Sequence, residues 1–91
     1  MKYKVVKYGA PWCGACTMMG PYIERAKIDF PEVSFEDVDV SLAENQCFLE
    51  EYKIIAIPAF ICFRDGKMVS KTTGALSYQE LSELVKNLIN E

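Results

Sequence analysis

The sequence contains no histidine, no long hydrophobic run and no cluster of basic residues. A transmembrane helix needs about 20 consecutive apolar residues, so we expect no membrane span. A net charge of −3 without a basic patch argues against nucleic-acid binding. The N-terminal residues hold no apolar stretch typical of a secretory signal, so we expect a cytoplasmic protein. The missing histidine removes one of the two usual ligands of zinc.

What is present fits one small globular domain, which we expect to span residues 1–91. Half of the residues are hydrophobic (51%), an ordinary share for a globular protein. A chain of this size buries roughly 60 to 65% of its unfolded surface, which is enough for one compact core. There is no room for a separate cofactor-binding domain. We therefore expect a monomer without a bound cofactor, which receives electrons from another protein.

Hydrophobic periodicity predicts alternating strands and helices. Ser41 to Glu44 and Ser77 to Glu80 both have the pattern of a capping box, which begins a helix. Pro21 lies inside the first predicted helix and is expected to kink it. The predicted elements are a strand at 3–8, a helix at about 14–30, a strand at 33–40, a helix at about 41–52, strands at 59–63 and 68–73, and a helix after residue 77.

The connections predict how these strands pair. The first two strands are joined by a helix, so they are expected to be parallel. The Asp65-Gly66 pair is a hairpin signal, so the last two strands are expected to be antiparallel.

Cys13 and Cys16 lie where the first predicted strand gives way to a helix. A thiol at a helix N-terminus faces unpaired backbone N–H groups and the positive end of the helix dipole. Both favour the thiolate, so we predict that the pKa of Cys13 lies below that of a free cysteine. The Cys13 thiolate would attack a substrate disulfide, and Cys16, one turn further on, would resolve the mixed disulfide. The expected redox centre is a reversible Cys13–Cys16 dithiol.

Two structural roles compete with this interpretation. A zinc site needs a second paired set of ligands, but Cys47 and Cys62 are far apart in sequence and no histidine is present. A scaffold held together by disulfides is disfavoured, because the clear helix and strand patterns predict a fold that does not need them. We expect Cys62, on a predicted central strand, to be a buried hydrophobic residue. Cys47 is a candidate regulatory thiol.

Residues 10–16 read Ala-Pro-Trp-Cys-Gly-Ala-Cys and resemble the active-site segment of the thioredoxin family. The resemblance covers nearly the whole chain. Pro21 is similar to the helix-kinking proline of the family, and residues 52–59 resemble the stretch that contains its cis-proline. Residues 65–67 match its hairpin, and residues 74–77 match its glycine loop. The first strand and helix of a full-length thioredoxin are missing, so the size is closer to that of glutaredoxins and short redoxins.

The resemblance implies an α/β thioredoxin fold in the order β-α-β-α-β-β-α, with a four-stranded mixed sheet flanked by three helices. It implies a thiol–disulfide oxidoreductase that reduces protein disulfides. Its substrates would be disulfide-containing proteins, and its electron donor a flavin- and NADPH-dependent thioredoxin reductase. No metal is implied, and the redox-active group would be the Cys13–Cys16 disulfide.

The resemblance also implies a substrate-binding surface. Pro58 would be cis and lie beside the two sulfurs, where its missing N–H removes a hydrogen-bond donor. The backbone of Ile57 would pair with an extended substrate segment by strand addition. Trp12, Pro58, Gly74 and Ala75 would line a shallow apolar groove.

Three positions depart from the family pattern. The dipeptide between the cysteines is Gly14-Ala15 instead of Gly-Pro, which implies a looser helix start and a more oxidising redox potential. Gly9 stands where the family usually has tryptophan. Lys7 stands where the family usually has a buried aspartate that relays a proton for Cys16.

Lys7 cannot act as a carboxylate, but a partly buried ammonium favours a nearby thiolate. Glu36 and Asp37, on the neighbouring predicted strand, are its candidate partners. We predict that Lys7 modulates the pKa of the active-site thiols. The alternative is that Lys7 extends to the surface and has no catalytic role.

Three other functions remain open. The short length favours a glutathione-dependent, glutaredoxin-like enzyme, whereas Trp12 to Cys16 and residues 74–77 argue against it. A disulfide oxidase or isomerase would require an oxidising compartment, which the missing signal disfavours. A redox-inert docking module is disfavoured by the intact dithiol with its proline.

Overall fold

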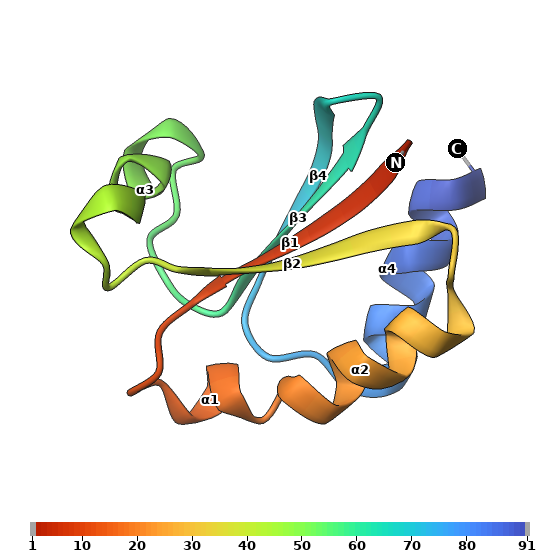
Figure 1. The fold of residues 1–91 in the computed structure, drawn as a ribbon, viewed down its shortest axis with the longest axis horizontal. Coiled ribbons are helices and arrows are strands. Elements are labelled where there is room, and N and C mark those ends of the chain that lie inside the picture. Colours follow the sequence, from red (N-terminus) through yellow and green to blue (C-terminus); the bar gives the residue numbers. More distant parts are fainter. Residues whose placement is uncertain (1, 91) are drawn as a thin grey trace.

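The computed structural model describes residues 2–90 and has the expected α/β architecture (Figure 1). Its strand order along the chain and its helix positions confirm the predicted fold class. Within residues 2–90, no helix is both long enough and apolar enough to cross a membrane. The elements are β1 (Tyr3–Gly9), α1 (Gly14–Thr17), α2 (Gly20–Asp29), β2 (Val33–Asp39), η1 (Ala43–Asn45), α3 (Cys47–Glu51), β3 (Ala59–Arg64), β4 (Lys67–Thr73) and α4 (Tyr78–Asn90).

The four strands form one mixed sheet in the order β2-β1-β3-β4. Strand β1 runs parallel to β2 and antiparallel to β3, as predicted for the helix-linked first pair. Strands β3 and β4 form the predicted antiparallel hairpin. Its turn residues Asp65 and Gly66 have φ values of 54° and 81°. An Asp-Gly turn suits this geometry because both residues tolerate positive φ.

Helices cover both faces of the sheet (Figure 1). Successive side chains of a strand point to opposite faces, so Val5 and Phe60 pack under α2 and α4, whereas Val6 and Ile61 pack toward α3. Cys62 is fully buried in the first of these clusters, as predicted. The central strands β1 and β3 are therefore buried on both faces. Pairing with β2 and β3 on its two edges also fixes the position of β1.

The first predicted helix is divided into α1 and α2, which corrects the expectation of one kinked helix. Pro21 lies in the first turn of α2, and Met19 is the residue that precedes this helix. Proline has no backbone N–H to continue a helix, but its fixed φ suits a first turn. The proline therefore starts a new helix instead of kinking an old one.

The two predicted capping boxes have opposite outcomes. In the first turn of α4, the Ser77 N–H donates to Glu80 Oε1 at 2.9 Å and the Glu80 N–H donates to Ser77 Oγ at 3.1 Å, which confirms that box. The box at Ser41 is wrong, because Ser41 Oγ donates to Asp39 Oδ1 at 2.6 Å. The expected helix at about 41–52 is correspondingly replaced by the 3₁₀ turn η1 and the short helix α3.

Candidate active site

Cys13 is the N-cap residue of α1, at the point where the chain leaves β1. Its backbone is extended, with φ −91° and ψ 109°, and the helix begins at the next residue. The backbone N–H of Cys16 donates a hydrogen bond to Cys13 Sγ at 3.3 Å. N-cap side chains usually satisfy such orphan N–H groups with oxygen. Here the capping atom is a sulfur that remains partly exposed to solvent.

The pKa of the Cys13 thiol is lowered from its ordinary value. The main cause is a hydrogen bond with the Cys16 side chain, and the backbone N–H groups of Cys16 and Ala15 add to it. The positive charge of Lys7 acts in the same direction, whereas desolvation opposes these effects. A thiolate is the species that reacts in disulfide exchange, so Cys13 has the properties of a nucleophile.

The pKa of the Cys16 thiol is shifted in the opposite direction. Its side chain is buried, and this burial is the main cause that raises the pKa of its thiol, with the hydrogen bond to Cys13 as the next cause. Within residues 2–90, neither Cys13 nor Cys16 is in a disulfide. The surroundings of Cys13 stabilise a thiolate, whereas those of Cys16 keep its thiol protonated. Opposite pKa shifts of this kind give two neighbouring acidic groups different roles.

The lack of a side chain at Gly9 leaves space for the Cys16 thiol. A Cβ added to Gly9 would lie 2.8 Å from Cys16 Sγ and 3.1 Å from Cys16 Cβ. The same Cβ would lie 3.5 Å from Lys7 Cε. A side chain at this position would therefore have to displace the thiol, since closely packed interiors leave no spare room. The departure at Gly9 thus has a local structural reason, which is that Cys16 and Lys7 occupy the space around it.

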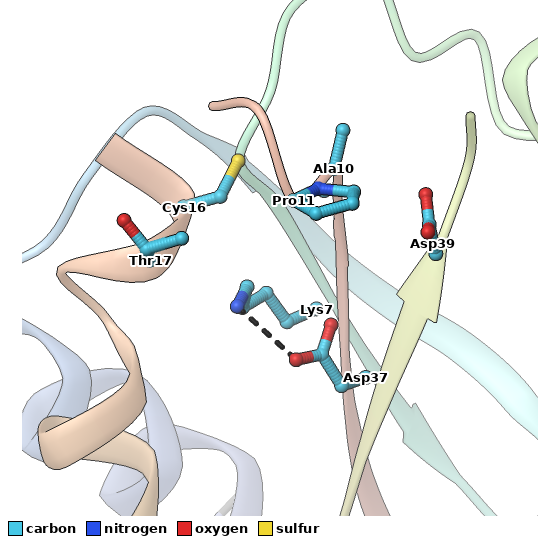
Figure 2. Close-up of a pocket in the computed structure, with 8 residues that line it drawn as sticks. Lys7, Ala10, Pro11, Cys16, Thr17, Asp37 and Asp39 are labelled. Carbon is cyan, nitrogen blue, oxygen red and sulfur yellow. Dashed lines mark hydrogen bonds and ion pairs between the residues drawn. The ribbon is translucent and has the colours of Figure 1, made fainter. Parts of the chain in front are cut away.

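Lys7 is a buried charged residue, and its Nζ contacts Asp37 Oδ2 at 3.2 Å (Figure 2). Strand register explains this pair, because Lys7 lies directly opposite Asp37 in the parallel β1–β2 ladder. The other candidate partner, Glu36, instead contacts Lys4 at 3.7 Å. The Lys7 side chain is 8% exposed, so it does not extend to the surface.

A cavity of about 360 Å³ lies between α1 and the ends of β1 and β2 (Figure 2). Lys7 and Asp37 form part of its wall, and Cys16 and Gly9 form another part. The buried thiol therefore borders a cavity whose wall also includes an ammonium and a carboxylate. We call it the charged cavity below.

The Ile57–Pro58 peptide bond is cis, as the family resemblance implies. The Gly74 N–H donates to the Pro58 carbonyl at 2.7 Å, which joins two of the residues that the sequence places in one groove. Trp12 is 74% exposed, and with Ile57 it lines a second cavity. That cavity extends toward α3, and sequence reasoning missed its exposed wall residue Ile55. The available signal was the pair Ile54-Ile55 in a predicted loop, because a loop seldom buries two consecutive apolar side chains.

The remaining cysteines stand apart from this site. Cys47 is exposed on α3, and its Sγ donates to the Glu44 carbonyl at 3.8 Å. In the part of the chain that the structure describes, no group of three or more histidine, cysteine or acidic residues could hold a metal ion.

Comparison with known proteins agrees with this geometry. The model of the family described as Thioredoxin matches residues 1–87. A thioredoxin of Mycoplasmoides gallisepticum is 41% identical over 85 residues, which cover 93% of this chain and 83% of that protein.

Solved structures also resemble this chain closely. The X-ray structure of Fasciola hepatica thioredoxin superposes with a TM-score of 0.84 at 34% identity, covering 94% of this chain and 80% of that one. A structure concerned with thiol resolution in yeast mitochondrial 1-Cys peroxiredoxin via glutathione/thioredoxin systems has a TM-score of 0.85 at 29% identity, with 94% and 78% coverage.

Proposed function

This chain belongs to the thioredoxin family and is a protein-disulfide reductase, and we propose that Cys13 is its nucleophile and Cys16 its resolving thiol. The observation that carries this assignment is the hydrogen bond of 3.3 Å from the Cys16 N–H to Cys13 Sγ. It stabilises negative charge on the Cys13 sulfur, whereas burial is the main cause that raises the pKa of the Cys16 thiol and keeps it protonated.

In the first step, the Cys13 thiolate attacks one sulfur of the substrate disulfide. A bond forms between Cys13 Sγ and that sulfur, and the other substrate sulfur leaves as a thiolate that takes a proton from solvent. The exposure of Cys13 allows this attack, whereas burial protects Cys16 from it. The product is a mixed disulfide between Cys13 and the substrate.

In the second step, Cys16 loses its proton and attacks Cys13 Sγ. The Cys13–Cys16 bond forms, the bond from Cys13 to the substrate breaks, and the second substrate sulfur leaves as a thiolate that is then protonated. The substrate has gained two electrons and two protons, and the enzyme dithiol has become a disulfide. No bound cofactor takes part in this exchange.

Lys7 assists both steps as a modulator of thiol pKa. Its ammonium lowers the pKa of Cys13 and of Cys16 through Coulombic attraction to their thiolates. Asp37 keeps the ammonium at the wall of the charged cavity. An ammonium here stabilises the thiolate directly, whereas the aspartate typical of the family would accept a proton.

The substrate segment lies against Trp12, Ile57, Pro58, Gly74 and Ala75. Within residues 2–90, no backbone hydrogen bond occupies the N–H or C=O of Ile57. An extended substrate segment can therefore add to this edge as a short strand.

The electron donor is a flavin- and NADPH-dependent thioredoxin reductase, and the substrates are disulfide-containing proteins. One related structure concerns thiol resolution through both glutathione and thioredoxin systems. The rate of reduction coupled to thioredoxin reductase should therefore be compared with the rate coupled to glutathione. One sheet carries both core clusters, which supports a single domain. This domain works as a monomer. A reducing compartment such as the cytoplasm suits the exposed Cys47 thiol.

The trapping experiment uses Cys16→Ser with a protein substrate that has one accessible disulfide. Because the second step is removed, the substrate is expected to accumulate as a mixed disulfide on Cys13, which intact-protein mass spectrometry detects. Cys47→Ser is the matched control and should turn over as the wild type does. Trapping by a Cys13→Ser variant instead would show that the roles of the two thiols are wrongly assigned.

A further inference from the structure

The loop between β4 and α4, residues 74–77, passes beside the junction of α1 and α2 (Figure 1). A hydrogen bond joins the two segments there, in which the backbone N–H of Leu76 donates to Met19 Sδ at 3.4 Å. The two residues are 57 positions apart in the sequence. Gly74 and Ala75 of this loop belong to the substrate groove proposed above, so a contact that fixes the loop also fixes part of that groove.

The acceptor of this hydrogen bond is a thioether sulfur, and its burial makes the bond matter. Such a sulfur is a weak acceptor, which water would replace at an exposed position. Met19 is 1% exposed and lies in the same core cluster as Val5 and Phe60, and Leu76 packs against that cluster. Without the sulfur, the Leu76 N–H would be left beside apolar side chains with no partner, and an unmade hydrogen bond costs most in such surroundings.

Met19 is also connected to the dithiol. It follows α1 by two residues, and its backbone N–H donates to the Cys16 carbonyl at 3.2 Å. Its own carbonyl accepts the Ile23 N–H of α2 at 2.9 Å. The Met19 backbone is therefore held by both helices, and its side chain extends from there to the loop. A continuous set of hydrogen bonds thus runs from Cys16 through Met19 to Leu76.

The other hydrogen bonds of the loop do not reach α1 or α2. The Gly74 N–H donates to the Pro58 carbonyl at 2.7 Å, and the Ser77 N–H donates to Glu80 Oε1 at 2.9 Å. Within residues 2–90, the bond to Met19 is the one hydrogen bond that joins loop residues 74–77 to the segment that carries the dithiol. This bond therefore helps to set the position of the loop relative to the two thiols.

We propose that Met19 is a positioning residue for substrate binding, because its sulfur holds Leu76, and with it Gly74 and Ala75, in a fixed position relative to the dithiol. Ala75 is exposed and lies between two residues whose N–H groups are bonded. A loop that is ordered before the substrate arrives lowers the entropic cost of binding. This role of Met19 rests on the substrate groove proposed above.

The consequence is an effect that depends on the size of the substrate. A polypeptide disulfide contacts the loop, whereas a low-molecular-weight disulfide reaches Cys13 without it. The groups that lower the Cys13 pKa do not include Met19, so the thiol itself should react as before when the sulfur is removed. A general packing defect would instead affect both kinds of substrate alike.

The kinetic test uses Met19→Leu, which replaces the thioether with a side chain of similar volume that accepts no hydrogen bond. The KM for a peptide dimerised through one disulfide is expected to rise about threefold at constant kcat, because one modest binding contribution is lost. The kcat/KM for bis(2-hydroxyethyl) disulfide should stay within about 1.5-fold of wild type. Leu88→Met makes the reverse exchange in the same core cluster and is the matched control, which should keep both values.

Hydrogen exchange followed by NMR measures the bond directly. The Leu76 amide is expected to exchange about tenfold faster in Met19→Leu than in wild type. The Leu81 amide, which donates to the Ser77 carbonyl at 2.9 Å, should keep its rate and show that the variant is folded. An unchanged exchange rate at Leu76 would overturn the proposed role of Met19.

A second variant separates Met19 from the groove. Ala75→Glu places a charge at an exposed loop position and should raise the peptide KM more than Met19→Leu does. If Ala75→Glu raises this KM and Met19→Leu does not, or if Met19→Leu affects both disulfides equally, the positioning role is refuted and the groove remains. If neither variant changes the peptide KM, the groove is wrongly placed and the role of Met19 is refuted with it.

Discussion

The two cavities that flank the Cys13–Cys16 pair differ in chemistry and in what they can contact. The charged cavity borders the buried Cys16 and contains the Lys7–Asp37 ion pair. The second cavity, which Trp12, Ile55 and Ile57 help to line and which we call the apolar cavity, borders the residue before the partly exposed Cys13. The first can influence proton and charge movement at the thiols, and the second can influence which polypeptide is held beside them.

This difference shows how a small domain separates recognition from reactivity. Residues of the charged cavity come mainly from β1, β2 and α1. Those of the apolar cavity come mainly from the loop at 54–57, with Leu49 as its one residue from α3. Changes on one side should therefore alter the thiols with little effect on substrate choice, and changes on the other side should do the reverse. Three variants test this separation.

The largest effect is expected from Gly9→Val on the charged side. Its side chain would overlap Cys16 Sγ, since even a Cβ lies 2.8 Å away. Overpacking of this kind costs about 1 to 3 kcal/mol, and displacement of the resolving thiol should slow the second step about tenfold or more. Rapid-quench mass spectrometry should show a long-lived mixed disulfide. Gly20→Ala is the control, because nothing lies within 4 Å of its added Cβ. Resolution at the wild-type rate in Gly9→Val would contradict the packing argument.

An intermediate effect is expected from Lys7→Met. Loss of the ammonium removes one cause of the lowered pKa of Cys13, so that pKa rises. Less thiolate is then present at pH 7, and alkylation of Cys13 should slow roughly two- to fivefold. The difference should disappear as the pH rises above the Cys13 pKa of both proteins, because each is then fully thiolate.

Lys4→Met is the matched control for this variant, because Lys4 also pairs with a carboxylate of β2 but forms no part of the charged cavity. Its alkylation profile should match that of wild type. An unchanged Cys13 pKa together with unchanged turnover in Lys7→Met would end the proposed role of Lys7.

The smallest effect is expected from Lys71→Met on the apolar side. It removes two hydrogen bonds that hold the loop carbonyls of Tyr52 and Lys53. A less ordered cavity wall should raise KM for a disulfide-linked peptide substrate about twofold and leave kcat unchanged. Lys67→Met, also exposed on β4, is the control. A fall in kcat at constant KM would instead connect this loop to the chemistry of the thiols.

Several features of this protein were predictable from neighbouring residues alone. The Asp65-Gly66 turn and the Ser77–Glu80 capping box depend on contacts within a few residues, and both form as predicted. The continuous apolar run at 59–63 is typical of a central strand, and β3 lies inside the sheet with Ala59 to Phe63 buried. The strand-to-helix junction at Cys13 likewise predicted a thiol of lowered pKa, since the helix N–H groups lie next to it in sequence.

Other local patterns were insufficient because a competing partner was available. Ser41 has the sequence of a helix cap, whose hydroxyl oxygen would accept a backbone N–H. Its hydroxyl instead donates to Asp39 Oδ1, and η1 begins after Leu42. Pro21 was expected to kink a continuous helix, and the chain instead begins α2 there. In both cases the sequence allowed two local arrangements, and the local pattern did not distinguish between them.

The sequence by itself determined the order of strands and helices, the dithiol at the start of α1, and the residue types available to it, because these depend on local hydrogen bonding and hydrophobic periodicity. Only the tertiary structure decided that Lys7 pairs with Asp37 and not Glu36, that Gly9 makes room for Cys16, and that Ile55 and Trp12 border one cavity. Those contacts depend on strand register and on the packing of segments far apart in the chain, and residue spacing along the sequence does not specify them.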